Sequence, residues 1–161
     1  MDTLVPENDI PSHQGPDAQS FDPSPDVITA AVKVPETLSH LHYWNVQLTK
    51  QAAKEELLEV FINSTRIAMI EYSEELQAKN VIEELMLALN RPYGDVYEVA
   101  QWEDMLKVVG DELFYAYVVD NQAIVIPETI DAISALKGIE QNAQKSVLKT
   151  NESLGVKQKF Y

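Results

Sequence analysis

The chain has 161 residues, which suits one domain with a terminal extension. Its formal net charge of −14 disfavours direct binding to nucleic acid or to anionic membranes, because carboxylates repel phosphate groups. It contains no cysteine, which excludes disulfides, thiolate nucleophiles and cysteine-ligated metals within these residues.

Residues 1–35 predict an extended, acidic, proline-rich arm. Five of the eight prolines lie in the first 25 positions, and each removes a backbone donor and favours extended geometry in the preceding residue. We therefore expect neither a helix nor a central strand over residues 1–26, whereas residues 27–34 could form an edge strand or continue the arm to Pro35. The apolar residues are too sparse to form a core, so we expect these arm residues to contact a partner: Leu4, Val5, Ile10 and Phe21.

The globular domain is expected over residues 36–150 and begins with two helices. The spacing of large apolar side chains predicts a short helix over 36–48. A second helix is predicted to begin after Thr49, which is a suitable N-cap, and to end near Asn63. Residues 66–72 follow, and a short apolar run of this kind fits a buried strand or a helix segment.

Two more helices are predicted in the middle of the domain. Ser73 is a suitable cap for the first, which is expected to end at Asn90, shortly before a proline. The second is predicted over 96–109, because apolar residues recur there at helical spacing and Gly110 is suited to follow its last turn.

The last part of the domain predicts a β-hairpin and a helix. Two β-rich runs over 113–126 flank Asp120 and Asn121, residues that tolerate the backbone geometry of a tight turn. A final helix is predicted after the hairpin, although Gly138 within it is unfavourable. Residues 151–161 are expected to form a short basic tail.

The expected fold class is α+β and helix-rich, with about four to five helices, one β-hairpin over 113–126 and, in one interpretation, a third strand at 66–72. Alternation places Tyr115 and Tyr117 on the same face of the hairpin. That face either packs on the helices or forms a contact surface, since tyrosine is enriched at interfaces. We therefore add both tyrosines to the expected partner contacts.

No motif for cofactor or metal binding stands out. The five glycines never occur at the spacing of a phosphate-binding loop, so we expect no cofactor. His40 and His42 could bind a metal together on a strand, whereas on a helix they would point about 200° apart. No third ligand follows at a suitable spacing. We therefore expect aromatic packing here and no metal, and we interpret the clustered carboxylates as solvated helix faces.

These observations favour a non-enzymatic structural or assembly subunit of a large multi-protein complex, such as a viral or phage particle, whose arm binds neighbouring subunits. An acidic inhibitor or adaptor that mimics DNA is the alternative. A small hydrolase or metal-dependent enzyme using His40 or His42 is a third option.

The expected partners are proteins, including other copies of this chain, rather than nucleic acid or membranes. The N-terminus lacks the apolar core of a signal peptide, so we expect synthesis in the cytoplasm followed by incorporation into a virion.

Overall fold

The computed structural model describes residues 4–36 and 38–160. The first three residues of the expected arm and the last residue of the expected tail lie outside the described residues, as does residue 37. The chain divides into two compact units, residues 1–37 and residues 38–161. Within the described residues, the first unit holds a two-stranded sheet and the second a five-stranded sheet.

The first unit is folded, which corrects the expectation of an arm without a helix. β1 (Val5–Pro6) pairs antiparallel with β2 (Val32–Lys33), and α1 (Gln14–Phe21) lies between them in the chain. Pro16 fits within the first turn of α1, because the first N–H groups of a helix have no intrahelical partner. The proline content therefore does not prevent a helix at this position.

Hydrogen bonds around Thr29 connect the segment after α1 to Ser12 and to the first turn of α1. The Thr29 hydroxyl donates to the Ser12 carbonyl at 3.0 Å and accepts from the Gly15 N–H at 3.2 Å. The Ser12 N–H donates to the Thr29 carbonyl at 2.8 Å. Ser12 is almost completely buried, so polar contacts take the place of an apolar core in this unit.

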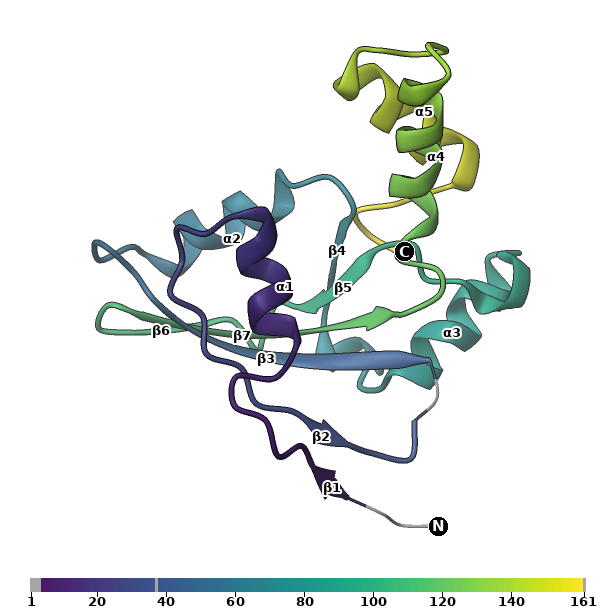
Figure 1. Ribbon diagram of the computed structural model, residues 1–161. Coiled ribbons are helices and arrows are strands. Elements are labelled where there is room, and N and C mark those ends of the chain that lie inside the picture. Colours follow the sequence, from purple (N-terminus) through teal and green to yellow (C-terminus); the bar gives the residue numbers. More distant parts are fainter. Residues whose placement is uncertain (1–3, 37, 161) are drawn as a thin grey trace. The chain divides into compact units, whose positions relative to one another are not determined.

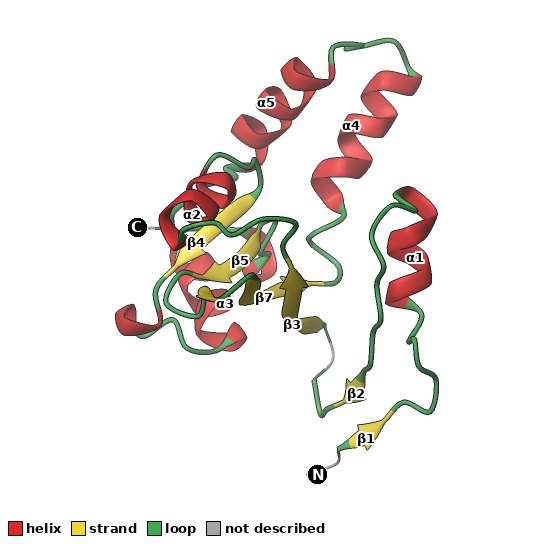
Figure 2. Cartoon of the chain, turned by 90° about the vertical axis from the view of Figure 1, so that its left-hand side faces the viewer, coloured by secondary structure: helices red, strands yellow, loops and turns green. Residues whose placement is uncertain are grey.

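The second unit is built on a mixed sheet with the strand order β3, β7, β5, β4, in which β6 also pairs with β7 (Figures 1 and 2). β4 and β5 run parallel, whereas the other pairs are antiparallel. The strands are β3 (Ser39–Gln47), β4 (Ile67–Ile70), β5 (Val99–Trp102), β6 (Lys107–Val109) and β7 (Glu112–Asp120).

Four α-helices accompany this sheet: α2 (Lys54–Ile62), α3 (Lys79–Ala88), α4 (Ile126–Leu136) and α5 (Ala143–Leu154). Short 3-10 turns occur at Tyr72–Glu74 and Pro92–Gly94. The α+β class is confirmed, but the described part of the chain is less helix-rich than expected. None of the helices in 4–36 and 38–160 has the length and apolar composition needed to span a bilayer.

The core of the second unit lies between α3 and one face of the sheet. Ala100 and Val118 are direct partners in the sheet, so they project on the same face. Ile82 and Met86 of α3 are completely buried in the same apolar cluster. The cluster comprises Ala68, Ile70, Leu76, Ile82, Met86, Val96, Ala100, Trp102, Ala116, Val118 and Phe160.

The helix expected over 36–48 is instead β3, a nine-residue strand. It pairs with the whole length of β7, from Ser39 opposite Asp120 to Gln47 opposite Glu112. Its apolar residues fit a helical spacing, but its side chains also alternate between more and less exposed positions, which is the period of a strand. Pairing with β7 stabilises the strand rather than the helix.

The helix expected over 96–109 is also wrong, because these residues form β5 and β6. β6 and β7 form the hairpin of the sheet, and Gly110 at its turn has a positive φ of 67°. The hairpin therefore turns ten residues earlier than expected. The Asp120 carboxylate accepts from the N–H groups of Gln122 and Ala123, at 3.0 and 3.1 Å, and ends β7 before α4.

The remaining elements are closer to expectation. α2 lies within the helix predicted after Thr49, and β4 is the strand that one interpretation of 66–72 predicted. The helix expected from Ser73 begins only at Lys79, after a 3-10 turn. α5 continues to Leu154 and so enters the expected tail.

Candidate functional site

A row of three side chains crosses the sheet on the face opposite to α3. His42 of β3 lies opposite Tyr117 of β7, and Tyr117 lies opposite Gln101 of β5. Directly opposed residues on antiparallel strands project on the same face, with Cβ atoms about 5 Å apart. We call these three residues the His42 row.

Aromatic rings surround the imidazole of His42. It stacks on the Tyr117 ring, with the two centroids 4.9 Å apart and the planes within 14°. The His40 ring meets the His42 ring edge-on at 5.8 Å. Next to them, Trp44 and Tyr115 lie parallel within 5°, with centroids 6.1 Å apart. Packing on both sides therefore restricts the orientation of the imidazole.

One end of this face is covered and the other is open. Phe61 of α2 lies over Tyr115, with 5.2 Å between the ring centroids. His42 is half-buried, and His40, two residues earlier in β3, is exposed. A molecule from solvent can therefore approach His42 from the side of His40.

Burial makes His42 a weaker base than an ordinary histidine. The loss of water around the ring lowers its pKa below 6.5, and the electrostatic interaction with His40 lowers it further. His42 is consequently neutral at pH 7. A neutral imidazole can accept a proton or a hydrogen bond through its unprotonated nitrogen.

The two tyrosines of this face keep their protons at neutral pH. Burial, assisted by Tyr117, raises the pKa of Tyr115 to about 12. Burial also raises the pKa of Tyr117, although the nearby indole N–H of Trp44 opposes this rise. Both phenols are therefore uncharged donors rather than bases.

Two nitrogen donors on this face are buried and unpaired. Gln101 is only 1% exposed. Among the described residues, neither its Nε2 nor the Nε1 of Trp44 finds a hydrogen-bond partner of good geometry. Unpaired buried donors are rare in native proteins and often occur where a water or a ligand supplies the acceptor. The His42 row thus ends in a buried amide N–H that has no acceptor among the described residues.

The structure also tests the placement of the two histidines for metal binding. β3 puts His40 and His42 on the same face, with their rings 5.8 Å apart. Within residues 4–36 and 38–160, no three His, Cys, Asp or Glu side chains are grouped so that they could hold a metal ion. We therefore assign no metal ligands.

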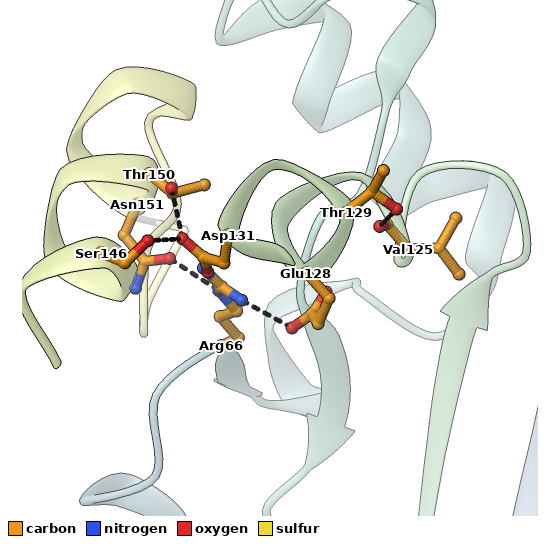
Figure 3. A network of polar contacts seen from close by, with 8 residues as sticks. All are labelled: Arg66, Val125, Glu128, Thr129, Asp131, Ser146, Thr150 and Asn151. Carbon is orange, nitrogen blue, oxygen red and sulfur yellow. Dashed lines mark hydrogen bonds and ion pairs between the residues drawn. The ribbon is translucent and has the colours of Figure 1, made fainter. Parts of the chain in front are cut away.

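A second polar cluster lies at Arg66 and connects three elements (Figure 3). Arg66, just before β4, donates to Glu128 at 2.7 Å and to Asp131 at 2.5 Å, both in α4. Its Nε donates to the Asn151 side chain in α5 at 2.7 Å. Each of the three guanidinium nitrogens thus donates one hydrogen bond, and the cluster connects α4 and α5 to the residue that precedes β4.

The residues expected to contact a partner lie in different environments. In the first unit the four arm residues are exposed. In the second unit Tyr115 and Tyr117 are half-buried in the ring stack around His42. No observation on the described residues shows a partner at either place, so these contacts stay a prediction.

The sequence analysis missed the His42 row, although one signal for it was present. His40 and His42 are two residues apart, so a strand there puts both on one face, with His42 opposite Tyr117 of the partner strand. Gln101 had no such signal, because the residues around it were assigned to a helix. The row is brought together only by the sheet.

Comparisons with known proteins give one consistent result. The chain is 34% identical over 157 residues to the glyceraldehyde-3-phosphate dehydrogenase of Methanobrevibacter smithii, which is 97% of this chain and 46% of that protein. With the enzyme of the same name from Pyrococcus furiosus it shares 36% over 156 residues, again 97% and 46%. With that from Haloarcula marismortui it shares 36% over 155 residues, 96% and 44%. No model of a protein family matches the chain.

This similarity corrects the expected function. The relatives carry the name of an enzyme, so the expectations of a non-enzymatic assembly subunit and of an acidic inhibitor are wrong. The expected location in a virion and the expected partners in a large viral assembly are wrong for the same reason. Familiar active-site motifs can be absent from a chain that matches only part of an enzyme.

The relatives are more than twice as long as the part that matches. The chain spans a little less than half the length of these curated relatives. Residues needed for an enzyme's reaction can therefore lie outside the matched part. Along nearly its whole length, this chain is similar to one part of glyceraldehyde-3-phosphate dehydrogenases.

Proposed function

We propose that this chain forms the part of a phosphorylated-aldehyde dehydrogenase that takes up the proton released by the substrate. The observation that carries this proposal is the 34% to 36% identity to glyceraldehyde-3-phosphate dehydrogenases over 97% of the chain. The His42 row supports it, because it provides a suitable proton acceptor at an accessible place.

The chemistry of dehydrogenation requires a base. An aldehyde carbon bears no hydroxyl group, so water must first add to the carbonyl. Oxidation of the resulting hydrate then transfers a hydride from the carbon to the acceptor and releases a proton from one hydroxyl group, which leaves a carboxylic acid. An imidazole that is neutral at the working pH can accept this proton. His42 meets the requirement because burial lowers its pKa, and because stacking on Tyr117 fixes its ring. In this proposal the Gln101 N–H donates a hydrogen bond to a substrate oxygen.

The name dehydrogenase implies a hydride acceptor, and the residues of this chain do not fit a dinucleotide. Sites for the pyrophosphate of NAD use closely spaced glycines between a strand and a helix. The five glycines here are isolated, at positions 15, 94, 110, 138 and 155. A Cβ at Gly94 would lie 3.0 Å from the Glu83 carbonyl oxygen, so packing within the chain accounts for that glycine. We therefore assign the dinucleotide to another part of the enzyme.

The proposal is tested by adding glyceraldehyde 3-phosphate to the isotope-labelled chain and following the imidazole signals by NMR. We expect the His42 signals to shift in a saturable way, while those of His13 in the first unit stay unchanged. His42→Ala removes the reporting ring, so binding to that variant is measured by calorimetry and is expected to be at least about tenfold weaker.

Tyr43→Ala is the matched control. Tyr43 is the next residue of β3 and projects from the opposite face, where it is 66% exposed. Its loss should leave binding unchanged. A His42 signal that does not respond to glyceraldehyde 3-phosphate, or equal weakening by both substitutions, would contradict the proposed role.

A further inference from the structure

Five rings form a continuous series of contacts from α2 to the exposed end of the face that carries His42. Phe61 of α2 contacts Tyr115 with 5.2 Å between the ring centroids, and Tyr115 contacts Tyr117 at 6.2 Å. Tyr117 stacks on His42 at 4.9 Å, and His42 meets His40 at 5.8 Å. We call these five residues the ring series. Each of its three inner rings contacts a ring before it and a ring after it.

The sheet sets the spacing of the inner rings but leaves their tilt open. Tyr115 and Tyr117 are two residues apart in β7, so they project on the same face, and Tyr117 lies directly opposite His42. Pairing of the backbones fixes these Cβ positions. The χ angles of the side chains are chosen separately, among a few staggered or broad minima. The orientation of each inner ring therefore depends on the rings packed against it.

Phe61 is the one member of the ring series that comes from outside the sheet. α2 packs beside β4 (Figure 2), and Phe61 in the last turn of α2 is partly buried. The ring of Trp44 in β3 also lies parallel to that of Tyr115, within 5°. Phe61 and Trp44 thus both restrict Tyr115. Tyr115 in turn limits the tilt of Tyr117, on which the imidazole stacks.

Burial of the ring series agrees with a covering role of Phe61. Burial is the main cause that raises the pKa of Tyr115 to about 12, and Tyr117 adds to this rise. Burial is also the main cause that lowers the pKa of His42. The titratable groups that face the imidazole are His40 of its own strand and Tyr117 of β7. The carboxylates of α2 are exposed: Glu55, Glu56 and Glu59.

We propose that Phe61 is a positioning residue for His42 and acts through Tyr115 and Tyr117. This rests on the proposed function, in which the imidazole must point at the proton that it takes up. A small misplacement of a reacting group can cost a large factor in rate, because reaction needs the atoms in contact and aligned. Phe61 holds Tyr115, and the ring series transmits this restraint to the imidazole. A helix outside the sheet thereby sets the orientation of the proton acceptor.

The test compares Phe61→Ala with Phe61→Tyr in the full chain without substrate. NMR follows the His42 imidazole and tyrosines labelled with 13C at Cζ through pH titrations. Phe61→Ala should let water reach Tyr115, so the pKa of Tyr115 should fall below about 12. The pKa of His42 should rise toward 6.5 as the ring series loosens. Phe61→Tyr keeps a six-membered ring at this position and should preserve both values.

Leu57→Ala is the matched control. Leu57 lies one turn before Phe61 on the same side of α2 and is also partly buried, but it carries no ring. The thermal midpoint reports the packing lost in either alanine variant, whereas only Phe61→Ala should change the titration of His42. Phe61→Leu, which keeps most of the apolar volume without the ring, gives the same test if the alanine variant does not fold. An unchanged His42 titration without the ring, or an equal change in Leu57→Ala, overturns the proposal.

Binding of glyceraldehyde 3-phosphate separates this proposal from the proposed function. In calorimetry, Phe61→Ala should bind it at least about threefold more weakly than wild type, and Phe61→Tyr should match wild type. Unchanged binding by Phe61→Ala would contradict the positioning role. If the wild-type chain does not bind this compound, the proposed function fails, whereas the titrations without substrate still decide whether Phe61 supports His42.

Discussion

Glu98 is the most deeply buried charged side chain in the described part of the molecule, with 0% exposure. Its two oxygens accept from the two Nη atoms of Arg91, each at 2.6 Å. Oε1 also accepts from the Lys157 N–H at 2.7 Å. Arg91 donates further to the Gly155 carbonyl at 2.7 Å. This ion pair therefore fastens the segment after α5 to the start of β5.

Removing one charge of this pair should strongly destabilise the protein. Glu98→Gln leaves the Arg91 guanidinium buried without its counter-charge, which is expected to cost about 3–5 kcal/mol of the free energy of unfolding. Urea unfolding measures the loss. Replacing both residues with methionine should cost less than the sum of the two single replacements. If Glu98→Gln lowers the free energy of unfolding by less than about 1 kcal/mol, other groups must compensate the charge of Arg91.

The titration of His42 can be predicted from its two neighbours in space. Its pKa should lie below 6.5 in an NMR titration of the folded chain, chiefly because of burial. His40→Gln should raise this pKa without restoring 6.5, since the charge of His40 is the smaller cause. The unfolded chain then binds the proton more tightly, so stability should fall as the pH drops below 6.5. A pKa at or above 6.5 would contradict both the burial and the assigned role.

At the scale of elements, α4 and α5 show how one residue changes an assignment. The sequence predicts one helix through Gly138, at a cost for the glycine. In the structure Gly138 has a positive φ of 67°, follows the last turn of α4 and allows the chain to reverse into α5. Read as a stop signal, it would have predicted the helix pair. Gly138 thus marked the end of α4 in the local sequence, but apolar residues at helical spacing on both sides of it favoured one continuous helix.

The strands β3 and β5 were not predicted from the sequence, for another reason. Short amphipathic segments can satisfy a period of 3.6 and a period of 2 within their scatter. Ser39–Gln47 and Val99–Trp102, which lie within two expected helices, are strands because β7 pairs with both β3 and β5. Such pairing joins residues about 75 positions apart, such as His42 and Tyr117. Local propensity contains no information about contacts between residues so distant in the sequence. By contrast, α2 was predictable because its own spacing suffices.

The attachment of α4 to α5 should depend on Asp131. Burial disfavours its charge, but hydrogen bonds from Ser146, Thr150 and Arg66 outweigh this and lower its pKa below 3.8. Asp131→Asn removes the more buried of the two counter-charges of Arg66, while Glu128 remains, and should lower the free energy of unfolding by roughly 2–4 kcal/mol. Hydrogen exchange should show faster exchange in α4 and α5 than in α3. Equal exchange in wild type and variant would show that the cluster does not hold the helix pair.

The pH dependence of this contribution has a definite sign. The folded pKa of Asp131 is lower than the unfolded value, so its stabilising effect is complete above pH 3.8 and is lost as the pH falls through the folded pKa. In acid unfolding, Asp131→Asn should therefore differ least from wild type at the lowest pH. A difference that grows toward low pH would contradict this assignment.

At the scale of the whole molecule, composition shows which sequence motifs the chain lacks, but it does not predict the function. These residues contain no phosphate-binding glycine loop, but they match less than half the length of the relatives, so this observation does not extend to the rest of those proteins. The candidate site could not be predicted from the sequence for a related reason. His42, Tyr117 and Gln101 come from three strands that are adjacent only in the folded sheet, so no sequence window contains them.

The excess of carboxylates should make stability depend on salt. At about 0.01 M salt the screening length is roughly 30 Å, so like charges repel across the whole molecule, whereas at about 0.15 M it is roughly 8 Å. With a net charge of −14, we expect the thermal midpoint measured by circular dichroism to rise over this range of NaCl. Replacing the exposed Glu55 and Glu59 with glutamine should reduce the rise, and Lys149→Gln should increase it. A midpoint that falls with salt would show that attractive pairs such as Glu140–Lys149 outweigh the general repulsion.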